Sequence, residues 1–229
     1  MNYNDYEIKD FTQERSLSFN DSFAILMRKV YLWMAMALVI TGVTSYGVAS
    51  SPGLMQAILT NNALLWVLII AEFGLVFAIS AAINKLSLTT ATLLFVLYSV
   101  INGATLSVIF LVYTMESIAS VFFITAGTFG VMAFIGYTTK KDLTSLGKML
   151  LMALIGLIIA TLVNVFFIQS SGFSLIVSYV GVLIFVGLTA YDSQKIKQML
   201  LQAPDAGESA QKLALLGALT LYLDFINLF

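Results

Sequence analysis

Long apolar runs alternate with short polar breaks along almost the whole chain after the first 29 residues. Each run is about as long as a helix that crosses a bilayer, roughly 20 residues. The runs predict spans at residues 30–49, 63–83, 86–113, 117–137, 146–168, 173–191 and 212–229. The fourth run is rich in small residues (Ala126, Gly127 and Gly130), which predicts close helix contacts there. The pattern therefore indicates an all-α polytopic membrane protein with seven transmembrane helices.

Composition agrees with this fold class and narrows the chemistry. Of 229 residues, 60% are hydrophobic and only 10% are charged, which excludes an ordinary soluble domain. The net charge of −1 argues against nucleic acid as a partner. The chain has no cysteine, which excludes disulfides, thiolate metal sites and cysteine catalysis. It has no histidine either, so any response to pH near neutrality has to come from buried or paired carboxyl groups.

The first 29 residues are polar and mixed in charge, and they lack the pattern of a cleavable signal. We predict that residues 1–29 form a cytoplasmic N-terminal tail and helix entry. Within this segment we expect Met1 to about Phe19 to be mobile, and Asn20 or Asp21 to cap the helix that leads into the first span. Residues 30–229 are then expected to form one seven-helix membrane domain.

Lysine and arginine predict the orientation, because they are enriched in cytoplasmic loops. All eleven fall in the tail or in the connections after the second, fourth and sixth predicted spans. They are Lys9, Arg15, Arg28, Lys29, Lys85, Lys140, Lys141, Lys148, Lys195, Lys197 and Lys212. The N-terminus is therefore predicted to be cytoplasmic, and the C-terminus to lie outside if the seventh segment crosses the membrane.

Three acidic residues stand in or at the end of apolar segments, where a charge costs a few kcal/mol or more. Asp224 lies within the last segment, LALLGALTLYLDFINLF, Glu72 at the centre of the second span, and Asp192 at the end of the sixth. We expect Asp224 to face the interior of the helix bundle, together with Tyr222 and Asn227. These three acids are the candidates for a functional site.

Structural roles for the same three acids remain open. Asp224 could be an interfacial residue that reaches the headgroups, and Asp192 an ordinary helix-end carboxylate beside Lys195. Glu72 could make a structural hydrogen bond to a helix backbone or to Asn102.

The sixth and seventh helices can bring two of the acids together. Asp224 lies about 16 Å along its helix from the cytoplasmic start. Asp192 can meet it if the sixth helix continues through Ile196–Leu201, whose apolar residues allow this. Two carboxylates at close range cannot both ionise cheaply, so we expect such a pair to share one proton.

Three stretches resemble the Bax inhibitor-1 (transmembrane Bax inhibitor motif) family, and its bacterial inner-membrane members in particular. They are LTLYLDFINLF at residues 219–229, LTAYDSQKIK at 188–197 and YTTKKDLT at 137–144. The resemblance covers almost the whole chain. It implies a multi-pass protein of the cell inner membrane whose seventh helix is central and surrounded by the other six. It also implies a calcium leak whose opening depends on pH through an aspartate pair.

On this resemblance the aspartate pair is Asp192 and Asp224, each inside its matching motif. The acidic residue of the family's second helix corresponds to Glu72, which we expect to line the ion pathway. Oxygen ligands without histidine or cysteine suit a hard cation, so the three acids together predict a weak, passable calcium site. Calcium is then the permeant or weakly bound ion, and no cofactor is expected.

The chain departs from the family at one position. In some members an arginine near the inner end of the second helix bonds to the sixth-helix aspartate and latches the closed state. The corresponding position here is Ile83, followed by Asn84 and Lys85. Lys85 and Asn84 are the possible replacements, although an ammonium group does not reproduce the bidentate fork of arginine.

Two other classes of function share features with this sequence. An intramembrane aspartyl protease also uses an aspartate on each of two neighbouring helices. That class carries a Gly-x-Gly before its second aspartate and a Pro-Ala-Leu motif. Here Tyr222 and Leu223 precede Asp224, and the only prolines are Pro52 and Pro204, so we do not expect an enzyme. A non-conducting regulator that binds and modulates a membrane protease, or other membrane proteins, remains the alternative.

Overall fold

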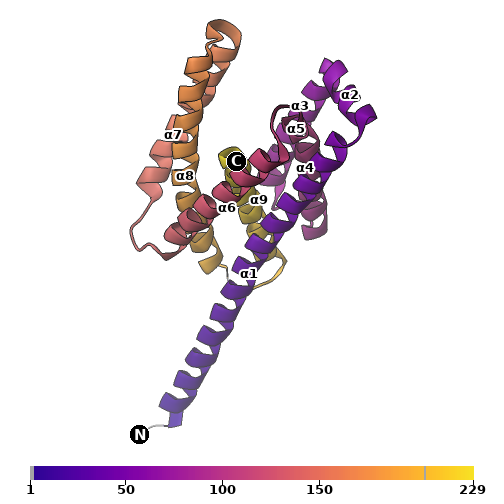
Figure 1. Ribbon diagram of the computed structural model, residues 1–229. Coiled ribbons are helices and arrows are strands. Elements are labelled where there is room, and N and C mark those ends of the chain that lie inside the picture. Colours follow the sequence, from indigo (N-terminus) through magenta and orange to yellow (C-terminus); the bar gives the residue numbers. More distant parts are fainter. Residues whose placement is uncertain (1–2, 204) are drawn as a thin grey trace. The chain divides into compact units, whose positions relative to one another are not determined.

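The structure, a computed structural model, consists of helices joined by short connections (Figure 1). It describes the backbone of residues 3–203 and 205–229 and the side chains of residues 21–203 and 205–229, and this part of the chain contains no β-strand. The helices are α1 (Tyr3–Ala49), α2 (Pro52–Thr60), α3 (Asn62–Ala82), α4 (Leu88–Leu106), α5 (Ile109–Val112), α6 (Met115–Thr138), α7 (Thr144–Val163), the π-helical turn η1 (Asn164–Ile168), α8 (Ser171–Leu201) and α9 (Glu208–Leu228). The predicted all-α class is confirmed.

The N-terminal part of α1 differs from its prediction. The expected N-cap at Asn20 or Asp21 is wrong, because α1 is helical from Tyr3 onward. Residues 3–20 contain neither glycine nor proline, so nothing in the sequence interrupts the helix before the apolar run. The side chains of the predicted mobile tail, Met1 to Phe19, lie outside the described residues.

Most other predicted spans coincide with a helix, and the breaks have local causes. α1 ends at Ala49, and Pro52 begins α2, where its missing N–H would have had no partner in any case. The fifth predicted span ends in η1 without glycine or proline. There the Asn164 amide donates to the Ser174 hydroxyl (2.9 Å) and accepts from the N–H of Ser170 (3.1 Å), while Gln169 adopts a left-handed conformation (φ 51°).

The third predicted span divides into two helices. α4 ends at Leu106 and α5 begins at Ile109, so that Ser107 and Val108 form a turn within the apolar run. An apolar run in the sequence does not reveal whether its helix is continuous or contains such a turn, because the hydrophobic pattern is the same in both cases.

The chain divides into two compact units, which are described separately. The first unit contains residues 1–106 and 198–218, and the second contains residues 107–197 and 219–229. The division falls within α8 and within α9, so each of these helices contributes to both units.

In the first unit, α1 lies closely against α4. The Thr41 hydroxyl donates a hydrogen bond to the carbonyl of Ser99 (3.0 Å). A Cβ atom at Gly103 would lie 2.6 Å from the Thr41 carbonyl oxygen and 2.8 Å from the Thr44 Cβ. Glycine is therefore required at this position for the two backbones to approach.

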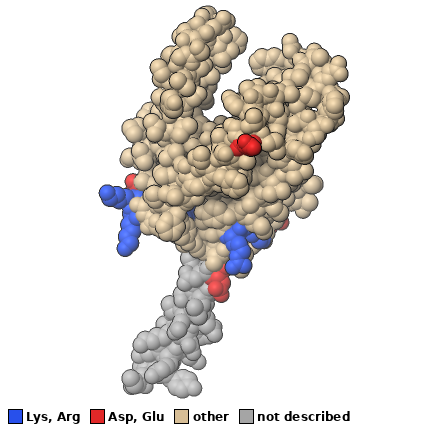
Figure 2. All heavy atoms as spheres, viewed as in Figure 1, with Lys and Arg blue, Asp and Glu red and all other residues tan. Residues whose placement is uncertain are grey.

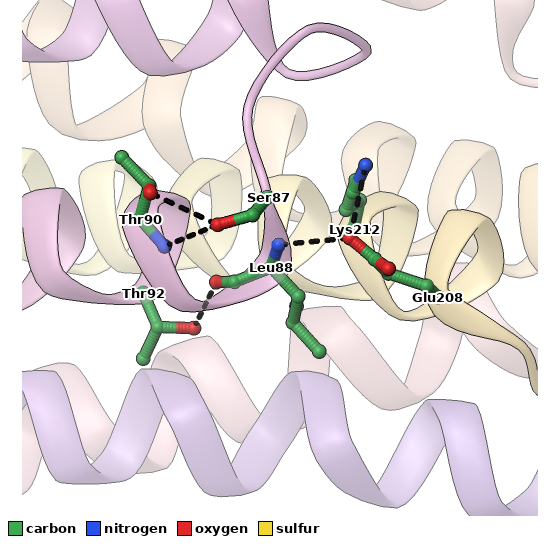
Figure 3. A network of polar contacts seen from close by, with 6 residues as sticks. All are labelled: Ser87, Leu88, Thr90, Thr92, Glu208 and Lys212. Carbon is green, nitrogen blue, oxygen red and sulfur yellow. Dashed lines mark hydrogen bonds and ion pairs between the residues drawn. The ribbon is translucent and has the colours of Figure 1, made fainter.

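Polar contacts join the starts of α4 and α9 in the first unit (Figure 3). The Glu208 carboxylate accepts from the backbone N–H of Leu88 (3.1 Å), the first residue of α4, and pairs with Lys212 (3.2 Å). Lys29 of α1 donates to the side-chain oxygen of Gln211 (2.7 Å). Lys29 and Lys212 thus lie at the same end of this unit.

In the second unit, glycines let α8 approach α6 and α7. A Cβ at Gly136 would collide with the backbone of Ala190, and one at Gly147 with the ring of Tyr191. A Cβ at Gly187 would lie 2.5 Å from Leu150 Cδ1. Tyr191 of α8 contacts Gly147 of α7, whereas the earlier residue Gly187 of α8 contacts the later residue Leu150 of α7. The two helices therefore run antiparallel.

The close contacts predicted in the fourth span lie elsewhere on the same helix. A Cβ at Gly127 or at Gly130 would meet nothing within 4 Å. The prediction is therefore wrong for these two glycines. Gly136, six residues beyond Gly130, makes the contact instead, because helix contact depends on which side of α6 faces α8.

Six helical stretches in the described residues are long and apolar enough to cross a membrane. They are Asp21–Ala49, Asn62–Ala82, Leu88–Val112, Met115–Thr138, Thr144–Ile168 and Ser171–Leu201. α9 is not one of them, because polar residues recur along it. Exposed apolar side chains are abundant on these stretches, and the face in Figure 2 carries few charged groups. The chain is therefore a polytopic membrane protein.

Candidate functional site: an aspartate pair in the second unit

α8 carries Asp192 and does not stop there. The helix continues to Leu201, nine residues further. This is the continuation through Ile196–Leu201 that was expected if Asp192 is to approach Asp224. The side chain of Asp192 is half-buried, and Lys195, one turn on, is close enough to interact with it electrostatically. Both belong to the second unit.

Asp224 lies in the last half of α9, which also belongs to the second unit. Its residue is only 5% exposed, and its Oδ2 atom has no hydrogen-bond partner among the described residues. Tyr222 and Phe225 beside it are buried, and the Phe225 ring packs on Phe122 and Phe129 of α6, with ring centroids 5.5 and 5.6 Å apart. Asp224 is thus a buried carboxyl group next to an aromatic cluster in sequence.

Asp192 and Asp224 both belong to the second unit. The charge on Asp192 acts directly on the carboxyl group of Asp224, so the two groups lie within electrostatic reach. The expected companion Asn227 is not part of this interior. It is exposed, and its amide donates to the Leu223 carbonyl of its own helix (2.7 Å), which satisfies it without an interior partner.

Two buried polar residues that the sequence pattern did not predict follow Asp192 directly. The Ser193 hydroxyl is buried and has no hydrogen-bond partner among the described side chains. Gln194 is also buried, and its amide binds the connection between α6 and α7 at Lys141 and Leu143. The signal in the sequence that could have identified these two residues is a polar Ser-Gln pair that directly follows an aspartate within a helix.

Glu72 lies on α3 in the first unit. Its Oε1 atom is buried and has no hydrogen-bond partner among the described residues. Its charge acts on the phenol of Tyr98 on α4, which is buried. The structural hydrogen bond considered as an alternative for Glu72 is therefore not made through Oε1.

The positions considered for the latch differ in exposure. Ile83 is buried, whereas Asn84 and Lys85 are exposed at the end of α3. The latch role of Asn84 and Lys85 stays a prediction.

A resident metal centre would need several ligating side chains together. Among the residues that the structure describes, no three His, Cys, Asp or Glu side chains form such a group.

Comparison with known proteins identifies the family. A family model described as "Inhibitor of apoptosis-promoting Bax1" matches residues 24–229. Inner membrane protein YbhL of Escherichia coli strain K12 is 52% identical over 204 residues, which cover 89% of this chain and 87% of that protein. An uncharacterized protein of Borreliella burgdorferi is 46% identical, covering 96% of this chain and 94% of its own length. Uncharacterized protein RP147 of Rickettsia prowazekii is 40% identical, covering 98% and 94%. The motifs around Asp192 and Asp224 and these matches agree: the chain belongs to the Bax inhibitor-1 family.

Proposed function

We propose that this protein is a calcium leak channel of the bacterial inner membrane, opened and closed by the proton content of the Asp192–Asp224 pair. The inner-membrane location is supported by the name of the Escherichia coli relative. The observation that carries the proposal is a buried Asp224, with an unbonded Oδ2, within electrostatic reach of Asp192.

The proposal includes a seventh crossing of the membrane by α9, surrounded by the other six spans. Support comes from burial, since Leu215, Leu219 and Tyr222 of α9 are almost completely buried. By contrast, Phe73 and Phe77 of α3 are each about three-quarters exposed (76% and 74%), as expected of side chains that face lipid. A helix that is shielded from lipid can carry polar residues across the membrane, which explains why α9 is less apolar than the rest.

The pair can act as a switch because of charge repulsion. In the proposed closed state the pair shares one proton, and Oδ2 of Asp224, which has no hydrogen-bond partner among the described residues, is the atom available for a hydrogen bond to Asp192 that holds α8 and the end of α9 together. Loss of that proton leaves two anions, whose repulsion at about 4 Å and an effective dielectric constant near 20 is roughly 4 kcal/mol. A bias of about 5.5 kcal/mol moves a two-state equilibrium from 1:99 to 99:1, so this repulsion supplies most of a switch. Rising pH therefore favours the open state.

Calcium is the proposed ion because the available ligands are carboxylate oxygens. In the open state Glu72 faces the ion's path from the outer side, and apolar side chains near the pair close the path when the pair is protonated. The unbonded, buried Oε1 of Glu72 supports this role, because a passing hydrated cation would satisfy it.

The test is calcium flux against pH in proteoliposomes, for the native protein, Asp192→Asn and Asp224→Asn. An amide can still form a hydrogen bond but cannot acquire the second negative charge, so each variant should lose the pH-dependent opening. Protons and calcium also compete for the same oxygens, so flux alone is ambiguous. A probe of the α8–α9 separation, measured without calcium, removes that ambiguity.

The matched control is Asp205→Asn, an exposed aspartate in the connection between α8 and α9, which should behave like the native protein. Retention of the native pH profile by both Asp192→Asn and Asp224→Asn would make the pair structural and move the gate elsewhere. A native protein that passes no calcium at any pH would favour the non-conducting regulator.

A further inference from the structure

The end of the second unit that contains the α6–α7 connection is rich in lysine. The lysines come from three segments: the connection itself, the start of α7, and α8 between Tyr191 and Lys197. They are Lys140, Lys141, Lys148, Lys195 and Lys197, and the acidic residues of the same segments are Asp142 and Asp192. Five lysines against two aspartates leave an excess of three positive charges. Blue side chains project from this end of the unit in Figure 2.

Contacts join α7 and α8 beside these lysines. A Cβ atom at Gly147 of α7 would collide with the ring of Tyr191 on α8, so the two helices touch next to Lys148. The Nζ atom of Lys195 lies 5.8 Å from the centroid of the same Tyr191 ring. Lys148 and Lys195 therefore belong to one surface, although they lie far apart in the sequence.

Hydrogen bonds from α8 fix the path of the connection between α6 and α7. The buried Gln194 amide donates to the carbonyl of Lys141 (2.8 Å) and accepts from the N–H of Leu143 (2.8 Å). Lys197 donates to the carbonyl of Tyr137 in the last turn of α6 (2.8 Å), with its Nζ atom 4.7 Å from the centroid of the Tyr137 ring. The backbone that carries the lysines of the connection is thus already ordered, so binding of a ligand there costs less conformational entropy.

Four of the five lysines present unpaired ammonium groups. Lys140, Lys141, Lys148 and Lys195 are exposed, and within the described part of the chain their Nζ atoms make no hydrogen bond or ion pair. We call these four residues the lysine cluster. In the first unit, by contrast, Lys29 donates to Gln211 and Lys212 pairs with Glu208. The lysine cluster therefore offers its positive charge to an anion from outside the chain.

Apolar side chains next to the lysine cluster indicate its depth in the membrane. α7 belongs to one of the six stretches that are apolar enough to cross. Near its start, Leu146, Met149 and Met152 are 38%, 55% and 67% exposed. Exposed apolar side chains of a spanning helix face hydrocarbon, and the lysines at its end reach the headgroup region. The lysine cluster thus lies at the level of the lipid phosphates.

We propose that the lysine cluster is a binding site for the phosphate headgroup of an anionic phospholipid, with an acyl chain along the exposed apolar side chains of α7. Ammonium groups bind phosphate as point charges, and four basic residues at the end of a membrane helix are typical of anionic lipid recognition. A soluble phosphate compound has the same charged group but no chain to cover Met149 and Met152. The site goes beyond the proposed function and does not depend on the passage of an ion.

The test measures how strongly the lysine cluster enriches an anionic lipid in proteoliposomes of phosphatidylcholine. Ser145→Cys places a fluorophore on an exposed residue of the first turn of α7, and the label is unique because the chain has no cysteine. Quenching by nitroxide-labelled phosphatidylglycerol is compared with quenching by nitroxide-labelled phosphatidylcholine. A basic residue near an anionic lipid contributes a factor of about five, so phosphatidylglycerol should quench severalfold more strongly.

Two variants and a matched control identify the residues. Lys141→Gln/Lys148→Gln should bring the ratio of quenching by the two lipids close to one, because glutamine keeps a long polar side chain without the charge. Arg28→Gln removes an exposed basic residue from the start of the first span in the other unit, and it should keep the native ratio. If the first variant does not fold, Lys140→Gln/Lys195→Gln replaces it with the same expectation.

A competition experiment separates a lipid from a soluble phosphate compound. Inorganic phosphate should lower the ratio no more than chloride does at the same ionic strength, since screening acts equally in both. Loss of the enrichment with phosphate but not with chloride would make the lysine cluster a site for soluble phosphate and overturn the proposal.

Equal quenching by the two lipids in the native protein, or a native ratio in the folded lysine variants, would overturn the proposal as well. A native protein that binds phosphatidylglycerol but passes no calcium would overturn the proposed function and leave the lipid site intact.

Discussion

At the scale of single residues, the second unit and the first each contain a buried carboxyl oxygen without a hydrogen-bond partner among the described residues. These are Oδ2 of Asp224 and Oε1 of Glu72. An unbonded buried oxygen lowers stability, so such atoms persist where they have another use, such as binding a proton, water or a passing ion. The sequence identified both residues from their apolar surroundings alone, because a charge in an apolar helix is recognisable without knowledge of its neighbours.

Glu72→Gln tests the role of the second of these residues. The amide keeps the size of the side chain but removes the negative charge that attracts a cation. We expect calcium flux to fall severalfold at every pH, with no shift of the pH midpoint and no loss of folded protein. Flux in liposomes at the native level would remove Glu72 from the ion path.

Asp142 gives a pH prediction that is independent of the gate. The side-chain and backbone hydrogen bonds from Thr144, the latter 2.9 Å from N to Oδ1, lower the pKa of the Asp142 carboxyl, and Lys148 adds to the effect. A lowered pKa in the folded state contributes stability above the unfolded pKa, and this contribution is lost as pH falls through the folded value. Asp142→Ala should therefore lower the thermal unfolding midpoint slightly at neutral pH and less at acid pH. An equal loss at both pH values would contradict this assignment.

At the scale of helices, packing is decided by which side of each helix faces its neighbour. α6 carries three glycines, Gly127, Gly130 and Gly136, and only the last makes a close contact with α8. The sequence placed the contact at the first two, because small residues are enriched at helix contacts in membranes. An apolar helix in lipid carries little information about its rotation, since lipid and protein neighbours are equally apolar.

Gly136→Ala tests this contact. The added Cβ would overlap the backbone of Ala190, which cannot move aside as a side chain can. We expect a loss of at least about 1–3 kcal/mol of stability, the usual cost of overpacking, together with an altered α6–α8 distance. Gly130→Ala is the control on the same helix, because its Cβ would meet nothing within 4 Å, and it should fold as well as the native protein. Equal stability of the two variants, measured by thermal unfolding in detergent, would rule out the close approach.

At the scale of the whole molecule, topology is the question that links the fold to the function. Six stretches of the described chain are apolar enough to cross a membrane, and α9 is the proposed seventh. The cytoplasmic side was predicted from the eleven basic residues.

Single cysteines can determine the topology, since the chain has none of its own. With seven crossings, a cysteine at Lys141 should react with an impermeant thiol reagent from the cytoplasmic side, and one at Phe229 from the opposite side. Labelling of both from the same side would mean that α9 does not cross, and the central position of α9 would be lost with it.

The sequence by itself determined the class of the protein and the six spans that the structure also supports, and it singled out three acids in apolar segments. Each of these depends on the transfer of a residue or segment between water and lipid, which is a local property of the chain. The family could also be identified from short strings, since the motifs around Asp192 and Asp224 are contiguous in sequence.

Only the tertiary structure decided how these parts meet. It extended α8 to Leu201 and placed Asp192 within electrostatic reach of Asp224. It also turned Asn227 outward, assigned the helix contact to Gly136 and gave Gln194 its two partners on the α6–α7 connection. These features depend on the rotation and register of helices whose surfaces are apolar on nearly every side. Such surfaces fit lipid in any rotation, so close backbone contacts and a few buried hydrogen bonds select one arrangement.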